Sequence, residues 1–234
     1  MKKIRLDKFI AQKLYLTRSQ ASKLLKSKSI KVNNIIITHN IDIDQNDIVK
    51  YNDEIIEFKD KYIYLALNKP QGYICANHDK NNATVFDLLP EKYSRIKDIH
   101  TVGRLDKDTT GLLLITNDGE LTHELLAPKK HVVKTYLVTV DKPLQNHLVP
   151  IFANGFDIDN DEKVKPSKLE ILSPYQARLQ ITEGKYHQVK RMFARHNYEV
   201  VQLHRESFGY LTLEKLNLEI GQYKEISKDE ILGH

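Results

Sequence analysis

Three short segments combine glycine with charged residues more densely than folding alone requires: residues 67–72, 102–111 and 183–191. The second segment holds Asp106 and Asp108, and in an extended backbone these side chains point to the same side as Arg104. A carboxylate beside a basic group stays ionised at neutral pH, and an ionised, partly desolvated carboxylate is a competent nucleophile. The segment therefore predicts carboxylate chemistry in basic surroundings. The same pattern is also typical of a turn that carries a surface ion pair.

Several other chemistries are not expected, because the sequence lacks the motifs that they require. The sequence contains no P-loop, no Gly-x-Ser-x-Gly elbow and no Gly-x-Gly-x-x-Gly turn. Its ten histidines form no His-Glu-x-x-His pair, and Cys75 is the only cysteine. A zinc site and an intramolecular disulfide are therefore not expected. A metal-dependent nuclease is not favoured either, because no convergent cluster of carboxylates is visible.

The composition is that of a soluble globular protein, with 41% hydrophobic and 29% charged residues. The apolar run at 62–67 is far shorter than the ~20 residues of a membrane helix. The first ten residues alternate charged and apolar side chains and lack the apolar core of a signal peptide. We therefore expect a cytoplasmic protein with no membrane partner.

Positive charge is concentrated at the start of the chain. The net charge is +5, yet residues 1–31 hold ten Lys or Arg against one acid, Asp7. A basic head on a neutral body favours a polyanionic partner such as nucleic acid, although a solvated lysine-rich surface has the same composition.

The head also has the pattern of a small folded unit. Apolar residues at helical spacing predict a basic helix over 6–14, and Thr17 with Gln20 predicts a capping box for a second helix. The pair at 33–34 lies between two β-rich runs and predicts a hairpin. The polar stretch 52–61 follows, and we place a domain boundary at 59–61.

The rest of the chain alternates short strands with few helices. Strands are expected at 62–67, 112–115, 135–140 and 177–181 by composition and alternation. Helices are expected at 120–126, after the strand at 112–115, and at 187–196, after the strand at 177–181. Because long crossover helices are few, the pattern predicts an α+β fold built on a mixed, mainly antiparallel sheet with a central cleft.

The head resembles the S4 RNA-binding domain. The resemblance rests on residues 5–7, on Ser19 and Ala21, and on Val32 with Asn33. It implies an RNA-binding domain at 1–58 whose basic helix face lies on folded RNA. The residues implied to contact RNA are Arg5, Arg18, Lys23 and Lys26. Two glycines of the family pattern are Ser29 and Asn34 here, and Asn tolerates a positive φ better than most residues.

The body resembles the pseudouridine synthases that modify ribosomal RNA. Residues 100–119, HTVGRLDKDTTGLLLITNDG, look like the signature of this family. Residues 67–72, 134–136 and 181–193 resemble further motifs in the same order. Together with the S4-like head, the resemblance covers almost the whole chain and points to the RsuA-type small-subunit branch. It implies a catalytic domain at 62–234.

The resemblance also assigns roles to individual residues. Asp106 is implied as the catalytic aspartate, which attacks the target nucleotide so that uracil detaches, rotates and rejoins through carbon. Tyr136 is implied to stack on the flipped base and to move a proton, and Lys190 to pair with the aspartate. Arg191 is a second choice for that pairing, and both Arg191 and Arg104 are expected to contact RNA. Asp108 is expected at the surface.

Two further assignments leave structural alternatives open. Lys69 is expected to contact RNA or to shape the cleft wall together with Pro70. His187 is expected to be a hydrogen-bonded structural histidine. No metal or organic cofactor is expected, because the reaction is an internal rearrangement without redox change.

The implied substrate is a uridine of 16S rRNA in an assembling small-subunit particle, modified by a monomer. The absence of a long basic C-terminal tail and the segment at 203–206 favour the small-subunit branch. The alternatives are a 23S rRNA pseudouridine synthase and a non-catalytic rRNA-binding assembly factor.

Overall fold

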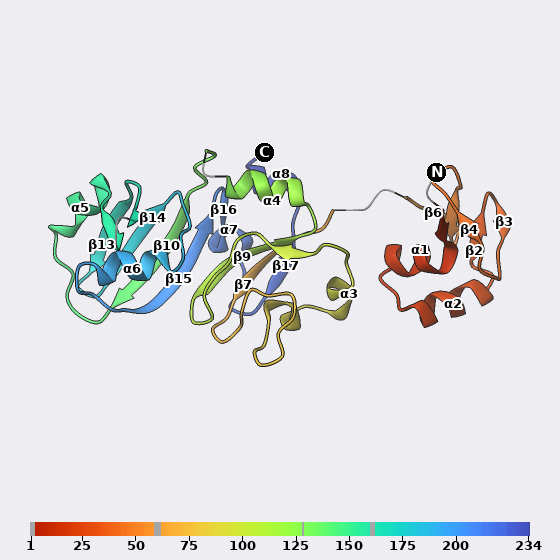
Figure 1. Cartoon of the computed structure of the whole chain (residues 1–234), viewed down its shortest axis with the longest axis horizontal. Coiled ribbons are helices and arrows are strands. Elements are labelled where there is room, and N and C mark those ends of the chain that lie inside the picture. Colours follow the sequence, from red (N-terminus) through yellow and green to blue (C-terminus); the bar gives the residue numbers. More distant parts are fainter. Residues whose placement is uncertain (1–2, 59–61, 128, 160–161) are drawn as a thin grey trace. The chain divides into compact units, whose positions relative to one another are not determined.

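The computed structural model describes residues 3–58, 62–127, 129–159 and 162–234. These fall into two compact units (Figure 1). The first comprises Met1–Tyr62 with Leu89–Ile99, and the second comprises Ile63–Leu88 with His100–His234. The boundary expected at 59–61 lies outside the described residues. None of the helices within the described ranges has the length and apolar character needed to cross a bilayer.

The first unit packs two helices, α1 and α2, with a small antiparallel sheet in the order β3-β2-β5-β6 and a separate β1-β4 pair. The elements are β1 (Ile4–Arg5), α1 (Leu6–Lys13), α2 (Arg18–Lys26), β2 (Ile30–Val32), β3 (Ile35–Ile36), β4 (Asp42–Ile43), β5 (Val49–Tyr51) and β6 (Glu54–Ile56). The short helix α3 (Glu91–Ser94) also belongs to this unit. Leu6, Phe9 and Ile10 of α1 are buried in its core, as their helical spacing predicts.

Local sequence signals define the connections of this unit. Thr17 accepts a hydrogen bond from the Gln20 amide, and the Gln20 side chain accepts one from the Thr17 amide, so the predicted capping box is confirmed. Asn33 and Asn34 adopt φ values of 51° and 68° between β2 and β3. The predicted hairpin is therefore confirmed, and asparagine occupies the left-handed region that its turn requires.

A nine-stranded sheet forms the centre of the second unit, with seven strands in the order β13-β14-β10-β15-β9-β7-β17. Strands β8 and β16 pair with β9 and β15. The strands are β7 (Tyr64–Lys69), β8 (His100–Thr101), β9 (Thr110–Thr116), β10 (Lys134–Val140), β13 (Lys168–Ser173), β14 (Gln176–Ile181), β15 (Val200–Phe208), β16 (Leu211–Thr212) and β17 (Tyr223–Glu225). Only the β15–β9 pairing of this sheet is parallel. The expected mixed, mainly antiparallel fold is therefore confirmed.

Short helices and a small hairpin surround this sheet. They are η1 (Val85–Leu88), α4 (Gly119–Leu126), α5 (Leu148–Asn154), β11 (Asp157–Asp159), β12 (Glu162–Lys163), α6 (Gln188–Ala194), α7 (Leu213–Leu216) and α8 (Lys228–Leu232). Apolar residues of α4, α7 and α8 pack with β9 in one buried cluster that includes Leu114, Leu121, Leu216 and Ile231. Helices α4 and α6 lie where the sequence predicts them, although α6 is shorter than the expected 187–196.

Strands β9 and β15 approach each other closely at Gly111. This glycine has a φ of 109°, and a Cβ placed on it would lie 2.3 Å from the carbonyl oxygen of Arg205. Both the backbone conformation and the contact exclude a larger residue. The absence of a side chain at Gly111 therefore allows β9 and β15 to pair closely at the end of the 102–111 segment.

We expect Gly111→Ala to lower the free energy of unfolding by about 3 kcal/mol, since it adds a backbone clash to a strained φ. The measurement is urea unfolding followed by circular dichroism. Gly119→Ala is the matched control, because a Cβ at Gly119 meets nothing within 4 Å. Equal stability of the two variants would contradict this account of Gly111.

Candidate active site

A cavity of about 790 Å³ lies in the second unit. Its lining includes part of the 102–111 segment, residues 181–189, and side chains of β10 and β15. Asp106, Tyr136 and Arg104, each assigned a role from the sequence, all contribute to this lining. The chain thus brings segments that are far apart in sequence around one space.

Asp106 lies on a loop between β8 and β9, in a part of the chain that is not an extended strand. A turn follows it, closed by a hydrogen bond of 3.1 Å from the Thr109 amide to the Asp106 carbonyl. The Asp106 side chain is 29% exposed. Lys190 Nζ lies 3.5 Å from one carboxylate oxygen and His187 Nε2 lies 3.4 Å from the other. The carboxylate is therefore accessible and lies between two basic side chains.

Lys190 also contacts Asp108, at 2.6 and 2.8 Å from its two carboxylate oxygens. The hydrogen bond from Lys190 holds the pKa of Asp108 below its usual range. Asp108 is exposed, as expected, but the sequence did not predict its ion pair with Lys190. Lys190 bridges both acids of the segment, with the shorter distance to Asp108.

Lys69 is fully buried, so the expectation that it contacts RNA is wrong. Its Nζ donates to the carbonyl oxygens of Asp106 at 3.0 Å, Thr109 at 2.7 Å and Lys107 at 3.3 Å. A fourth carbonyl, that of Pro70, lies at 3.2 Å. Burial lowers the pKa of this lysine. Lys69 is therefore a positioning residue that binds the backbone of the loop carrying Asp106.

Cys75 supports the same loop from its other end. Its Sγ lies 3.3 Å from the amide nitrogen and 3.4 Å from the carbonyl oxygen of Leu105. Arg104, one residue earlier, is exposed and lines the cavity. The loop is thus anchored on both sides of Asp106 and leaves the Arg104 side chain accessible to a ligand.

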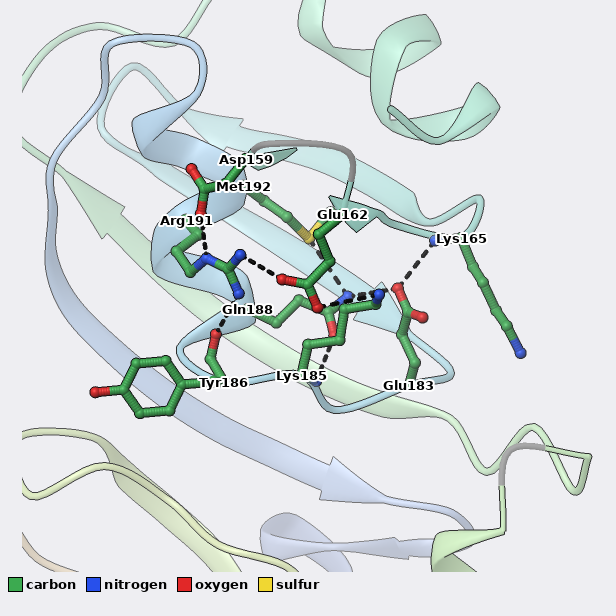
Figure 2. Close-up of polar contacts among 9 residues, drawn as sticks. All are labelled: Asp159, Glu162, Lys165, Glu183, Lys185, Tyr186, Gln188, Arg191 and Met192. Atoms are coloured by element: carbon green, nitrogen blue, oxygen red, sulfur yellow. Dashed lines mark hydrogen bonds and ion pairs between the residues drawn. The ribbon is translucent and has the colours of Figure 1, made fainter. Parts of the chain in front are cut away.

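The loop at 183–188 forms another part of the lining, and Figure 2 shows how it is fixed. The Gln188 side chain accepts a hydrogen bond from the Lys185 amide at 2.9 Å and donates to Glu183 at 2.8 Å. Glu183 also accepts the Lys165 amide at 2.9 Å. These contacts close the loop just before α6, the helix that carries Lys190.

Arg191 is directed away from Asp106, into ion pairs with Asp159 at 2.6 Å and with Glu162 (Figure 2). It also donates to the Tyr186 carbonyl at 2.9 Å. The sequence named Arg191 as an RNA contact and as a second choice for pairing with Asp106. In this structure its guanidinium instead joins the β11–β12 hairpin to α6, so Lys190 is the residue that reaches Asp106.

His187 is held in an unusual conformation at the start of α6, with a φ of 46°. Its ring stacks on Tyr186, with ring centroids 3.8 Å apart. The expectation of a structural histidine did not anticipate its contact with Asp106. The sequence did contain one signal for this contact, because His187 directly precedes the helix that carries Lys190.

One face of the central strands forms the remaining lining. Tyr136 on β10 pairs with Arg205 on β15, and Lys134 pairs with Phe208. Residues directly opposite in an antiparallel pair share a face, and all four line the cavity. Burial, and then the neighbouring Arg205, lower the pKa of Lys134 to about 8. Lys134 and Arg205 were not singled out as site residues, because nothing local to them indicates burial.

The four basic residues of the first unit that the sequence assigned to RNA binding fall into two groups. Arg5 and Arg18 both bind the buried carboxylate of Asp7, at 3.0 and 2.8 Å. Lys23 and Lys26 are exposed on α2, with no contact recorded among the described residues. Asp7 thus orients the two arginines, while the two lysines remain available to a polyanion.

No metal-binding arrangement is found in the described part of the chain. Within residues 3–58, 62–127, 129–159 and 162–234, no group of three or more His, Cys, Asp or Glu side chains is placed to hold an ion. Asp106 instead lies between Lys190 and His187, and Glu183 is hydrogen-bonded to Gln188. The arrangement suits a carboxylate that reacts directly with a ligand.

Comparison with known proteins agrees with this geometry. The sequence model of the family described as RNA pseudouridylate synthase matches residues 63–195, and that of the S4 domain matches residues 4–55. The chain is 42% identical to the ribosomal small subunit pseudouridine synthase A of Haemophilus influenzae over 97% of this chain and 98% of that protein. The corresponding Escherichia coli K12 protein is 39% identical over the same shares.

A solved structure supports the same conclusion. The crystal structure of a pseudouridylate synthase matches 98% of this chain and 98% of its own, with a TM-score of 0.68 and 41% identity. The matched family model includes Asp106, Tyr136 and Lys190. Sequence, fold and cavity thus agree, and the chain belongs to the RNA pseudouridylate synthase family and carries an S4 domain.

Proposed function

We propose that this protein isomerises a specific uridine of 16S rRNA to pseudouridine, with Asp106 as the nucleophile. The observation that carries the proposal is the position of the Asp106 carboxylate at the cavity that also contains Tyr136. Lys190 Nζ and His187 Nε2 lie 3.5 and 3.4 Å from its two oxygens and hold the carboxylate at the cavity.

In the proposed reaction, Asp106 attacks the target nucleotide, and the bond between C1′ of the ribose and N1 of uracil breaks. The ring turns and forms a new bond from C5 to C1′, so no atom of the base is lost except the proton exchanged at C5. Lys190 orients the carboxylate. The reaction is an internal rearrangement, so it needs no redox cofactor.

The target base must first leave its stack, which costs a few kcal/mol. Stacking on Tyr136 would return ~1–3 kcal/mol. Phosphate contacts must supply the rest, and Arg104 is an exposed cation at the cavity that is suited to this. Base capture and backbone contacts thus share the cost of flipping.

We assign RNA binding to residues 1–58 and catalysis to residues 62–234. The small-subunit target follows from the names of the relatives and from the S4 domain, which suits structured RNA. Two linked contacts raise the effective concentration of each and select RNA with both sites at a fixed separation. A folded loop in an assembling small-subunit particle in the cytoplasm meets that condition, and the protein acts there as a monomer.

The test is to incubate the protein with 16S rRNA, 23S rRNA and reconstituted small-subunit particles, and to map pseudouridines by carbodiimide primer extension. One new stop in 16S rRNA, stronger in particles than in naked RNA, is expected. A stop only in 23S rRNA would replace the target and keep the chemistry. RNA binding without any stop would indicate an assembly factor.

The free lysines of α2 give a prediction for binding. The Lys23→Ala/Lys26→Ala variant should bind 16S rRNA more weakly, and its slope of log K against log salt should be shallower by about 1.4–1.8, since each lost phosphate contact contributes about 0.7–0.9. The measurement is filter binding over a range of salt concentrations.

The matched control is Lys31→Ala/Lys50→Ala, which removes the same charge from the sheet of the same unit. Lys31 is paired with Asp53 at 2.5 Å, and Lys50 donates to Asn34 at 3.0 Å. We expect a smaller effect because these lysines have partners within the protein. Equal slopes for the two double variants would mean that α2 makes no specific phosphate contact.

A further inference from the structure

Arg205 is a buried cation for which the fold provides an incomplete set of partners. The residue is 2% exposed. Its Nε donates to the carbonyl oxygen of Leu112 at 2.7 Å, but its Nη2 is buried without a hydrogen-bond partner among the described residues. Buried donors in native proteins are nearly always satisfied, so an unsatisfied one requires an explanation. A charged donor makes the requirement stronger, because burying an unpaired charge is costly.

The charge of Arg205 is also not balanced by a neighbouring acid. In the described ranges it forms no ion pair with a carboxylate, whereas Arg178 on β14, two strands away in the same sheet, is bound to Glu206 at 2.8 Å. The charged neighbour of Arg205 is another cation, Lys134, whose pKa it helps to lower. Both cations lie over the ring of Phe208, at 5.3 and 5.4 Å from its centroid. This part of the cavity therefore holds two cations. Glu183 acts on the charge of Lys134, but within the described ranges neither cation forms an ion pair with a carboxylate.

The position of Arg205 suits a contact with the flipped base and not with the RNA backbone. It is directly opposite Tyr136 in the β10–β15 pairing and shares its face of the sheet. The surrounding lining is apolar and includes Ile181, Leu203 and Phe208. A flat ring stacked on Tyr136 would meet this surface, while the phosphates would stay with the exposed Arg104. The ligand that fits is a ring with a carbonyl oxygen that becomes negatively charged.

We propose that Arg205 is a catalytic residue that donates a hydrogen bond from Nη2 to a carbonyl oxygen of the flipped uracil and stabilises the negative charge that this oxygen gains during isomerisation. This inference rests on the proposed function, and it deepens that function by naming the group that stabilises the base as an anion.

The charge arises by either route of attack. When Asp106 attacks C1′, the C1′–N1 electron pair leaves on the ring and is shared by N1 and the two carbonyl oxygens. C5 then bonds to C1′, the electron pair of the C1′–O bond returns to Asp106, C5 loses its proton and N1 gains one. When Asp106 instead adds to C6, the electron pair of the C5–C6 double bond moves through C4 onto O4. A fixed donor at the oxygen lowers the barrier in both cases.

The test compares Arg205→Met and Arg205→Lys with the wild type and with Arg178→Met as the matched control. Tritium release from 16S rRNA transcribed with [5-³H]uridine is followed under single-turnover conditions, and RNA affinity is measured by filter binding. We expect the single-turnover rate to fall by about 100-fold or more in Arg205→Met and about 10-fold in Arg205→Lys. RNA affinity should stay within about threefold, and Arg178→Met should keep the wild-type rate.

Thermal unfolding identifies any variant that fails to fold. If Arg205→Met unfolds below the assay temperature, Arg205→Lys decides, because it keeps the charge and most of the volume. A wild-type rate in folded Arg205→Lys would overturn the proposal, and so would a loss confined to RNA affinity, which would indicate a backbone contact. A wild type that releases no tritium from 16S or 23S rRNA would overturn the proposed function itself.

Discussion

Asp106→Asn should abolish pseudouridine formation while leaving the fold and RNA binding intact. The amide has the size of the carboxylate but cannot act as a nucleophile, so a loss of at least about 10⁴-fold in turnover is expected. The backbone of the loop does not depend on this side chain, because Lys69 binds the carbonyl oxygen of Asp106 and not its carboxylate. Affinity should be unchanged or slightly tighter, since one negative charge is removed from a site that receives a polyanion.

The matched control for this prediction is Asp108→Asn. It makes the same chemical change two residues away, at an acid that contacts the same lysine. Since Asp108 is exposed and bound to Lys190, its loss should leave turnover within about tenfold of the wild type and free Lys190 for Asp106. Both are measured by tritium release from rRNA. Substantial turnover by Asp106→Asn, or an equal loss in Asp108→Asn, would remove Asp106 from its assigned role.

Lys69→Met should give the second large effect, through the position of the loop and not through a lost RNA contact. Methionine fills a similar volume but leaves the carbonyl oxygens of Asp106 and Thr109 without their buried donor. Leaving buried acceptors unpaired costs about 1–3 kcal/mol each, so unfolding should become easier by about 2–4 kcal/mol. A displacement of about 1 Å at the carboxylate should lower turnover by about 100-fold.

Lys107→Met is the control, because it removes a lysine from the same loop. Lys107 is exposed, and its Nζ donates to the side chain of Asn82 at 2.8 Å. Urea unfolding, tritium release and the salt dependence of RNA binding distinguish a role of Lys69 in positioning the loop from a direct contact with phosphate. An unchanged salt slope with lower turnover is expected for Lys69→Met. A shallower slope with normal stability would mean that Lys69 contacts phosphate after all.

Local patterns in the sequence were sufficient to predict the class of fold and several elements, although the strand β15 (Val200–Phe208) was not among them. The capping box at Thr17, the hairpin at Asn33 and Asn34, and the strand at 135–140 are all present in the structure. Each depends on residues close together in the chain, where propensity and spacing act directly. The same holds for the family signature at 100–119, which identified Asp106 as the central candidate from one continuous segment.

The partners of the charged residues were decided only by the tertiary structure. The family resemblance implied that Lys69 and Arg191 contact RNA, with the cleft wall as the alternative place for Lys69. The fold instead buries Lys69 beneath the Asp106 loop and directs Arg191 to Asp159. Which groups surround a charge depends on strand pairing and helix packing between distant segments, and no local pattern records this.

Arg205 illustrates the same limit most clearly. In the sequence Arg205 lies in the segment 203–206 that favours the small-subunit branch, but no role in the site was assigned to its side chain. Strand pairing places Arg205 opposite Tyr136 and inside the cavity, and it places Arg178 beside Glu206. The sequence by itself determined several of the elements, the family signature and the candidate carboxylate Asp106, because these lie in continuous segments. The tertiary structure decided which charges are neutralised and which remain available to the substrate, because burial and pairing arise only when separate strands assemble into one sheet.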